Sequence, residues 1–340
     1  MTAGLLSRSP EEGARLLALS FLDQAAAARP RLADTGDTEA LHDFRVGLRR
    51  LRSCLRAYAA QLADSIPKKL AKRLKRLAGS TGPGRDSEVQ IEWLRARSPH
   101  LSSHHRAGLA WLLARLEERK REAYGEMEDE VADEFDKVEA DLRVRLSVYR
   151  VEIHLDPKSD RPTLAEVTAR ILHRQVAELE QHLAKVTDAD DETEAHQARI
   201  SAKRVRYLLE PLVDEIPGAG PVVKRFKALQ DLLGELHDAH VLEAELSDAA
   251  EEAAAERSLK ILKLSLAAAP DDRLLRAERR RAHEAGVIAI ARLNRIRRDR
   301  LFDALDEEWL DGKAADFLRE VEGLGERMTA AAAPATESAQ

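Results

Sequence analysis

The strongest constraint on the fold is the stretch Leu41–Arg52, in which apolar and cationic residues each recur at helical spacing. The apolar residues follow an i, i+3, i+7 pattern that is typical of a buried helix face: Leu41, Phe44, Leu48, Leu51, Leu55 and Tyr58. The cationic positions follow the same pattern one residue later, about 100° further round the helix axis: His42, Arg45, Arg49 and Arg52. The stretch therefore predicts a helix that buries one stripe and carries a second, cationic stripe beside it.

The same pattern occurs a second time, 154 residues further along the chain. The positions of His42, Arg45, Arg49, Arg50 and Arg52 correspond there to His196, Arg199, Lys203, Arg204 and Arg206. The same shift superposes Ser9 on Thr163, two expected helix caps, and a slip of two residues superposes Lys72 and Lys75 on Lys224 and Lys227. An internal duplication explains these matches. It predicts two pseudo-symmetric helical bundles of about four helices each.

Composition supports an all-α fold. The chain has 340 residues, of which 44% are hydrophobic and only 4% aromatic. Alanine and leucine are abundant, whereas the chain has only 16 glycines and 12 prolines, and this balance favours helices over strands. The length suffices for a sizeable core.

Turn signals divide the chain into its expected parts. We expect an N-terminal tail at 1–8, a first repeat at about 9–150, a second repeat at about 160–325, and a disordered tail at 326–340. The stretch Val148–Leu155 reads as strand-like and precedes the boundary between the repeats. In the second repeat we expect one helix to end at Leu236 and another to open at His237 and Asp238.

Several classes of protein are not favoured. The Gly79–Gly84 loop lacks the Gly-Lys-Ser/Thr ending of a phosphate-binding P-loop and is read as a turn between helices. Cys54, the single cysteine, is expected in the core, without a disulfide framework. No apolar run is long enough for a membrane span, and the N-terminus does not resemble a signal peptide. We therefore expect a cytoplasmic protein with no membrane partner.

The cationic stripe lacks matching anions. Asp43 is the one acidic residue within Leu41–Arg52, whereas exposed helices usually pair opposite charges at i, i+4. Arginine binds phosphate with a planar fork, and lysine binds it as a mobile point charge. The overall net charge of −6 does not oppose a local basic site, because the carboxylates can cover the rest of the surface. The two stripes predict a groove for a long phosphorylated polyanion.

The duplicated His-x-x-Arg-x-x-x-Arg/Lys-Arg-x-Arg pattern resembles the conserved-histidine α-helical domain family, known as CHAD. The Leu229–Asp238 segment fits that family too, as does its degenerate first-half partner ending in Arg85 and Asp86. The resemblance implies two four-helix bundles and a basic surface that binds inorganic polyphosphate. It also leaves association with polyphosphate granules and homo-oligomerisation open.

Carried over position by position, the resemblance implies one polyphosphate-binding set. Its members are His42, Arg45, Arg49, Arg50, Arg52, Lys72, Lys75, His196, Arg199, Lys203, Arg204, Arg206, Lys224 and Lys227. We expect no catalytic residue, cofactor or metal, because no carboxylate or nucleophile repeats beside the histidines. The pair His237 and Asp238 could suggest a metal, but arginine stands at the first-half position of the histidine and cannot ligate one. Asp86 and Asp238 are read as helix caps or as ion-pair partners of the cations.

Three alternatives to a non-catalytic polyphosphate binder stay open. A nucleic-acid binder would use the same cations, but the sequence offers few aromatics for base stacking and no recognition motif. An enzyme that processes polyphosphate would release orthophosphate. An interaction module would place an acidic segment of a partner protein in the basic groove.

Overall fold

The described residues of the computed structural model form α-helices and short 3-10 turns, with no strand among them. The structure describes residues 4–33, 37, 39–80, 83–125, 128–148, 161–267, 273–280 and 283–332. The all-α prediction is confirmed. The expected strand at Val148–Leu155 lies almost entirely outside the described residues, as does the boundary between the repeats. Among the described helices, none combines the length and apolarity that a membrane span needs.

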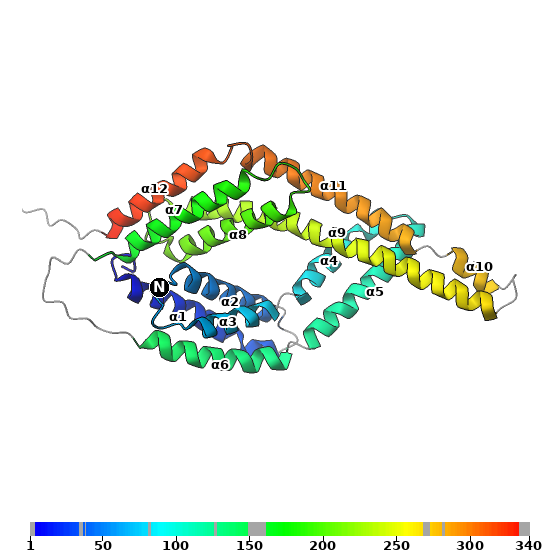
Figure 1. Ribbon diagram of the computed structural model, residues 1–340, viewed down its shortest axis with the longest axis horizontal. Coiled ribbons are helices and arrows are strands. Elements are labelled where there is room, and N and C mark those ends of the chain that lie inside the picture. Colours follow the sequence, from blue (N-terminus) through cyan, green and yellow to red (C-terminus); the bar gives the residue numbers. More distant parts are fainter. Residues whose placement is uncertain are drawn as a thin grey trace, which may run out of the picture.

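The helices of the two halves follow one another in a similar order (Figure 1). The first half contains α1 (Pro10–Ala28), α2 (Ala40–Ala57), α3 (Lys68–Ser80), α4 (Pro83–Arg97), α5 (Ser103–Gly125) and α6 (Glu128–Ser147). The second half contains α7 (Leu164–Leu183), α8 (Glu192–Leu209), α9 (Ala219–Ala267), α10 (Arg273–Arg280), α11 (His283–Trp309) and α12 (Ala315–Ala332). The expected caps of the first helix in each half are confirmed, because the hydroxyls of Ser9 and Thr163 accept hydrogen bonds from the amides of Glu12 and Glu166 at 3.3 Å.

Two sequence-based expectations about helix ends need correction. The helix expected to end at Leu236 continues through His237 and Asp238, so that α9 is one helix from Ala219 to Ala267. In the first half, α3 ends at Ser80 and α4 begins at Pro83, in a segment rich in glycine and proline. The second half has no proline at the matching place, so nothing interrupts the helix there. At the C-terminus, α12 continues to Ala332, beyond the start expected for the tail at residue 326.

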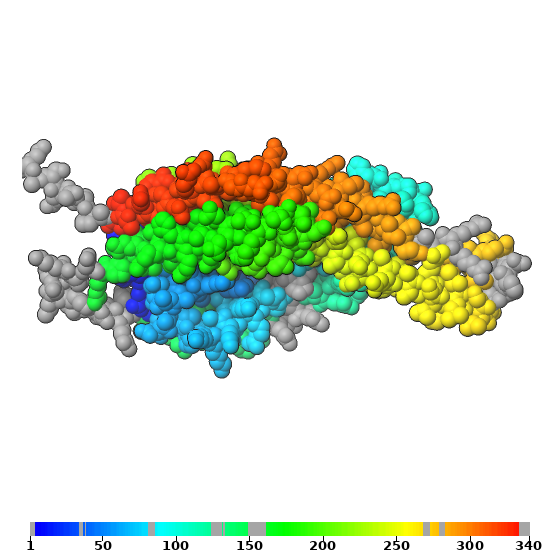
Figure 2. Space-filling view, turned by 45° about the horizontal axis from the view of Figure 1, so that its top comes forward, coloured from blue at the N-terminus to red at the C-terminus, as the bar shows by residue number. Residues whose placement is uncertain are grey.

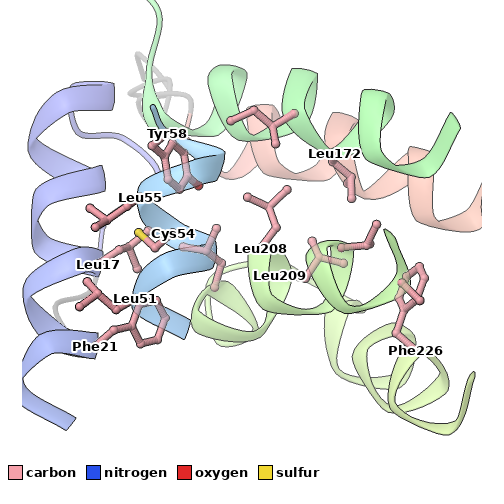
Figure 3. Packing of buried hydrophobic residues seen from close by; sticks show 14 of the residues in the cluster. Leu17, Phe21, Leu51, Cys54, Leu55, Tyr58, Leu172, Leu208, Leu209 and Phe226 are labelled. Atoms are coloured by element: carbon pink, nitrogen blue, oxygen red, sulfur yellow. The ribbon is translucent and has the colours of Figure 1, made fainter. Parts of the chain in front are cut away.

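Two hydrophobic clusters form the core. The larger one joins α1, α2, α3 and α6 of the first half to α7, α8, the start of α9, the end of α11 and α12 of the second half. Leu172, Leu208 and Leu209 of the second half pack in it together with Leu51 and Tyr58 of the first (Figure 3). The smaller cluster joins α4 and α5 to the later part of α9 and to α11. Both halves thus contribute to each cluster, and α9 and α11 of the second half take part in both.

Glycine allows α1 and α2 to pack closely. A Cβ atom on Gly47 would lie 2.7 Å from the backbone nitrogen of Ala25 and 2.9 Å from its Cα atom. These are backbone atoms, so a side chain at this position would force the two helices apart. Gly47 lies between the cationic positions Arg45 and Arg49 on α2. The close approach therefore fixes the position of the helix that carries the first cationic stripe.

A buried hydrogen bond joins the halves. The hydroxyl groups of Tyr58, at the end of α2, and Thr168, on α7, lie 2.8 Å apart, and the two residues are 1% and 0% exposed. Burial raises the pKa of the Tyr58 phenol, which therefore stays protonated and able to donate. Cys54, one turn earlier, is also buried, and burial raises the pKa of its thiol to about 12.

Replacing Tyr58 by phenylalanine should lower the free energy of unfolding by about 1–2 kcal/mol, because it deprives the Thr168 hydroxyl of a buried partner. Urea denaturation of Tyr58→Phe, Thr168→Val and the double variant measures the coupling between the two side chains. We expect the double variant to be more stable than the sum of the single effects predicts. Additive effects would show that the two hydroxyl groups do not interact.

Candidate functional site

Helix α2 holds its cations beside a buried apolar stripe. Phe44, Leu48 and Leu51 are each 0% exposed, as the spacing predicted. Arg49 and Arg52 are only partly exposed on the neighbouring side of the helix. The apolar stripe is anchored in the core, so it fixes the direction in which the cationic stripe faces.

Helix α8 repeats this arrangement in the second half. Ala198, Ala202 and Val205 are each 0% exposed, while Arg199 and Lys203 are partly exposed. Helices α2 and α8 contact one another, as do α1 and α7. The two cationic stripes therefore meet where the two halves of the chain join.

A cleft of about 920 Å³ lies at this junction, lined by residues of α1, α2, α3, α7 and α8 and of the segment between α2 and α3. Its floor is apolar and includes Phe21, Leu55 and Tyr58, three residues drawn in Figure 3. Eight cationic side chains line it: Arg49, Arg52, Arg56, Lys68, Lys75, Arg174, Lys203 and Arg204. Among the residues that line it there is one carboxylate, Glu178, which accepts a hydrogen bond from Arg204 at 3.2 Å. The lining thus has a large excess of positive charge.

The cations from the two halves repel one another. Burial, together with the positive charges of Arg199, Arg49 and Arg206, lowers the pKa of Lys203 to about 7, and the charge of Asp238 partly opposes this shift. Burial also lowers the pKa of Arg199, whereas the negative charges of Asp238 and Asp86 raise it in part. An unbound cluster of this kind is electrostatically unfavourable, and an anion that enters it relieves the repulsion.

Two arginines of this cationic cluster also have hydrogen-bond donors without a partner in the described part of the chain. The Nε atoms of Arg49 and Arg199 are buried and have no hydrogen-bond partner among the described atoms. A buried donor without a partner costs free energy, more so when the group is charged. Phosphate oxygens would satisfy such donors well, because guanidinium groups bind them with two parallel hydrogen bonds.

The second-half histidines form a pair. The Nδ1 atoms of His196 and His237 lie 3.3 Å apart, and a guanidinium nitrogen of Arg199 lies 3.4 Å from Nδ1 of His196. Burial, followed by the charge of Arg199, lowers the pKa of His196 and lowers that of His237 to about 4. In the protein without a bound anion, both imidazoles are therefore mainly neutral at pH 7. His42, by contrast, is exposed.

The two aspartates that occupy matching positions in the repeats, Asp86 and Asp238, lie near the cationic cluster. Asp86 lies in the first turn of α4, and Asp238 lies in the interior of α9. The interpretation of Asp238 as a helix cap is therefore wrong. Both carboxylates favour the charged form of Arg199, so their alternative interpretation as electrostatic partners of the cations fits the structure. The side chain of Arg85 lies outside the described part of the chain.

The structure brings only part of the predicted set into the cleft. Five predicted residues line it: Arg49, Arg52, Lys75, Lys203 and Arg204. Arg199 reaches the same charge cluster from the neighbouring turn of α8. The remaining predicted residues do not line the cleft: His42, Arg45, Arg50, Lys72, His196, Arg206, Lys224 and Lys227. Of these, Lys72, Lys224 and Lys227 are exposed, and Lys227 pairs with Asp231 at 2.7 Å.

Arg50 and Arg206 instead bind other parts of the protein. Arg50 donates to Glu210 at 2.6 Å and to Gln24 at 3.0 Å. Arg206 donates to Gln230 at 2.8 Å, pairs with Glu210 at 3.5 Å, and lies over the ring of Tyr207. Glu210 therefore bridges Arg50 of the first half to Arg206 of the second. These two arginines stabilise the junction between the halves.

Three cations of the cleft were not in the predicted set: Arg56, Lys68 and Arg174. Arg56 follows Arg52 by one turn of α2 and could have been added from helical spacing alone. Arg174 has serine at the matching place of the first half, Ser20, so the comparison of the repeats gave no signal for it. Lys68 begins α3, and only the fold shows that this end of the helix reaches the cleft.

Together the fold and the site define an all-helical protein with a cationic cleft at the junction of its two halves. A family model described as the CHAD domain matches residues 17–247, and the chain therefore belongs to the CHAD domain family. The crystal structure of the CHAD domain from the plant Ricinus communis is similar, with a TM-score of 0.56 and 23% sequence identity over 84% of this chain and 93% of that one. No match was found among the curated proteins.

The two comparisons cover different lengths of the chain. The family model ends within α9, whereas the structural similarity extends over most of the chain. At this low sequence identity the similarity to the plant domain shows the fold alone. The family assignment agrees with the resemblance drawn from the duplicated cationic pattern.

Proposed function

We propose that the cleft binds inorganic polyphosphate and does not hydrolyse it. The observation that carries this proposal is the lining of the cleft, where eight cations meet a single carboxylate. Polyphosphate consists of closely spaced phosphates without bases or sugars, so it needs many cations and no base-reading groups. The half-buried arginines supply geometric recognition of phosphate oxygens, and Lys75 and Lys203 supply further charge.

A nucleic acid would bind to the same charges, but the aromatic residues of the cleft do not favour it. Phe21, Tyr58 and Tyr207 line the cleft, and they are 6%, 1% and 6% exposed. Bases stack on the exposed faces of aromatic rings, and these rings are largely covered. The covered rings support our proposal of polyphosphate rather than single-stranded nucleic acid as the ligand.

An enzymatic role would need groups that act on phosphate. In the described part of the chain, no group of three or more His, Cys, Asp or Glu side chains is placed to hold a metal ion. Burial, and then the charge of Arg199, hold down the pKa values of the paired imidazoles of His196 and His237. Our proposal assigns them to hydrogen bonding in the site. Release of orthophosphate from polyphosphate by the purified protein, with divalent metal present, would contradict the non-catalytic proposal.

The direct test is a calorimetric titration with polyphosphates of graded length, repeated at several salt concentrations. Affinity should rise with chain length until the cleft is filled, and it should fall steeply with salt because bound cations replace the counterions of the polyanion. An Arg45→Ala/Arg49→Ala/Arg199→Ala/Lys203→Ala variant should show weaker binding and a shallower salt dependence. Binding with the wild-type affinity and salt dependence in this variant would contradict the proposed site.

The pH dependence of binding tests the role of Lys203. Its pKa in the free protein is lowered to about 7, so Lys203 loses its charge as the pH rises through 7. The charges that face it are Arg199 and Arg206 on α8, Arg49 on α2 and Asp238 on α9. A bound polyanion favours the charged lysine, so binding takes up a proton above pH 7. We expect affinity for long polyphosphate to fall between pH 7 and 8.5, by at most about tenfold per pH unit.

The control for this prediction is Lys203→Arg, which places at this position the residue type that the first half has in Arg49. Because arginine stays charged over the whole range, the variant should bind with little dependence on pH between 7 and 8.5. An equally steep fall in the variant would show that another group causes the pH dependence.

A further inference from the structure

The end of α9 forms a tip that projects past the body of the molecule, with α10 beside it (Figures 1 and 2). Four leucines of this tip are highly exposed: Leu259 at 57%, Leu262 at 54%, Leu266 at 81% and Leu274 at 66%. Large apolar side chains are seldom gathered in this way on the surface of a monomeric protein, and such gatherings mark interaction sites. The tip lies beyond the residues that line the cleft and takes no part in the proposed polyphosphate site.

Three of the exposed leucines share a face of α9. Leu259, Leu262 and Leu266 are spaced i, i+3 and i+7, which places them along one side of the helix. Leu275 of α10 is buried at 2% exposure, and Ile261 and Leu264 are partly buried. Helices α9 and α10 contact one another, and these less exposed side chains belong to that pair of helices, whereas more than half of the surface of Leu259, Leu262 and Leu266 is exposed.

Positive charge surrounds these leucines. Among the described side chains of 257–267 and 273–278, the cations are Arg257, Lys260, Lys263, Arg273 and Arg276, and the one carboxylate is Glu278. Glu278 is 9% exposed and pairs with Lys260 at 2.9 Å. Lys263, Arg273 and Arg276 are exposed. Arg257 pairs with Glu284 at 2.5 Å. Over residues 257–284 the sequence holds eight lysines and arginines against four aspartates and glutamates. The described surface of the tip is thus basic and apolar, although the chain as a whole has a net charge of −6.

We propose that the tip of α9 and α10 binds the surface of an anionic lipid membrane. Apolar side chains that enter the boundary between headgroups and acyl chains, flanked by lysine and arginine, are the usual means by which a helix binds a membrane surface without crossing it. Anionic headgroups attract each of the flanking cations. A projecting end can reach a flat membrane. The sequence-based expectation of no membrane partner rested on the lack of a membrane span, which surface binding does not require.

Self-association through the same tip is less favourable. Two copies joined tip to tip would bring Lys263, Arg273 and Arg276 near their own counterparts, and like charges across an interface repel. A membrane supplies opposite charge as well as an apolar layer. The anionic membrane therefore complements both properties of the tip.

Co-sedimentation with lipid vesicles tests the proposal. Wild-type protein should sediment with vesicles of phosphatidylcholine and phosphatidylglycerol, should stay in solution with phosphatidylcholine alone, and should be released by salt. A Leu259→Ser/Leu262→Ser/Leu266→Ser variant should bind the mixed vesicles at least about tenfold more weakly. These leucines are exposed, so the variant should keep the wild-type circular dichroism spectrum.

A cleft variant separates this proposal from the proposed function. Arg49→Glu/Lys203→Glu removes charge from the cleft and should leave vesicle binding at the wild-type level. Loss of vesicle binding in this variant would assign the binding to the cleft and overturn the proposal. The proposal is equally overturned if wild-type protein does not sediment with the mixed vesicles, or if the serine variant sediments as well as wild type. It is also overturned if the wild-type protein is a dimer in solution and the serine variant is a monomer.

Discussion

An Arg49→Glu/Lys203→Glu variant is expected to bind polyphosphate at least ~100-fold more weakly than wild type, which corresponds to about 3 kcal/mol. Arg49 comes from α2 and Lys203 from α8, so this pair joins the two cationic stripes across the cleft. The two substitutions replace attraction of the phosphates by repulsion at the centre of the site. They also place carboxylates beside Arg199, where they would compete with phosphate for the guanidinium. Titration calorimetry on both proteins measures the change.

The matched control is Arg295→Glu/Arg319→Glu, which changes the net charge by the same amount. Arg295 and Arg319 are 73% and 74% exposed on α11 and α12, and neither lines the cleft. This variant should lose no more than the small factor that general electrostatic attraction explains. If both double variants lose binding equally, net charge rather than the cleft determines the affinity.

Replacing Phe44 by alanine is expected to lower the free energy of unfolding by about 3–5 kcal/mol. Phe44 is 0% exposed and meets the ring of Phe135 on α6 edge to face, with ring centroids 4.9 Å apart. Its removal leaves a cavity between α2 and α6 and deletes the aromatic contact. Because Phe44 anchors the helix that carries Arg45 and Arg49, the variant should also bind polyphosphate more weakly where it remains folded. Urea denaturation gives the stability.

Leu266→Ala is the control substitution for Phe44→Ala. Leu266 is 81% exposed, so its truncation removes apolar atoms that water already covers and should change the stability by less than about 0.5 kcal/mol. A cost below about 1 kcal/mol for Phe44→Ala would mean that α2 is not anchored through its apolar stripe.

Helical spacing was sufficient to predict the main helices, because an amphipathic helix keeps its pattern whatever it packs against. The buried stripe of Phe44, Leu48 and Leu51 illustrates this. The prediction failed at His237 and Asp238, where we expected one helix to end and another to begin. A break depends on local residues such as Pro83, and the matching place in α9 has none. Helical spacing therefore predicts that a helix exists better than it predicts where the helix ends.

The candidate site was less predictable than the fold. Four residues that the pattern singled out line the cleft: Arg49, Arg52, Lys203 and Arg204. The pattern could not show that Arg50 reaches Glu210, because that partner lies 160 residues away. It also missed Arg174, which has no cationic counterpart in the first half. The partner that each side chain of a stripe reaches depends on which helices pack against that stripe. Residue spacing within one helix does not reveal this packing.

The most direct test of the central claim is a competition measurement at moderate salt. Labelled polyphosphate is bound to the wild-type protein and displaced either by unlabelled polyphosphate or by single-stranded RNA of equal phosphate number. The covered aromatic rings of the cleft and its excess of cations predict that polyphosphate competes much more strongly per phosphate than RNA does. Equal potency per phosphate would contradict the account, since it would show that the cleft recognises negative charge without distinguishing polyphosphate from nucleic acid.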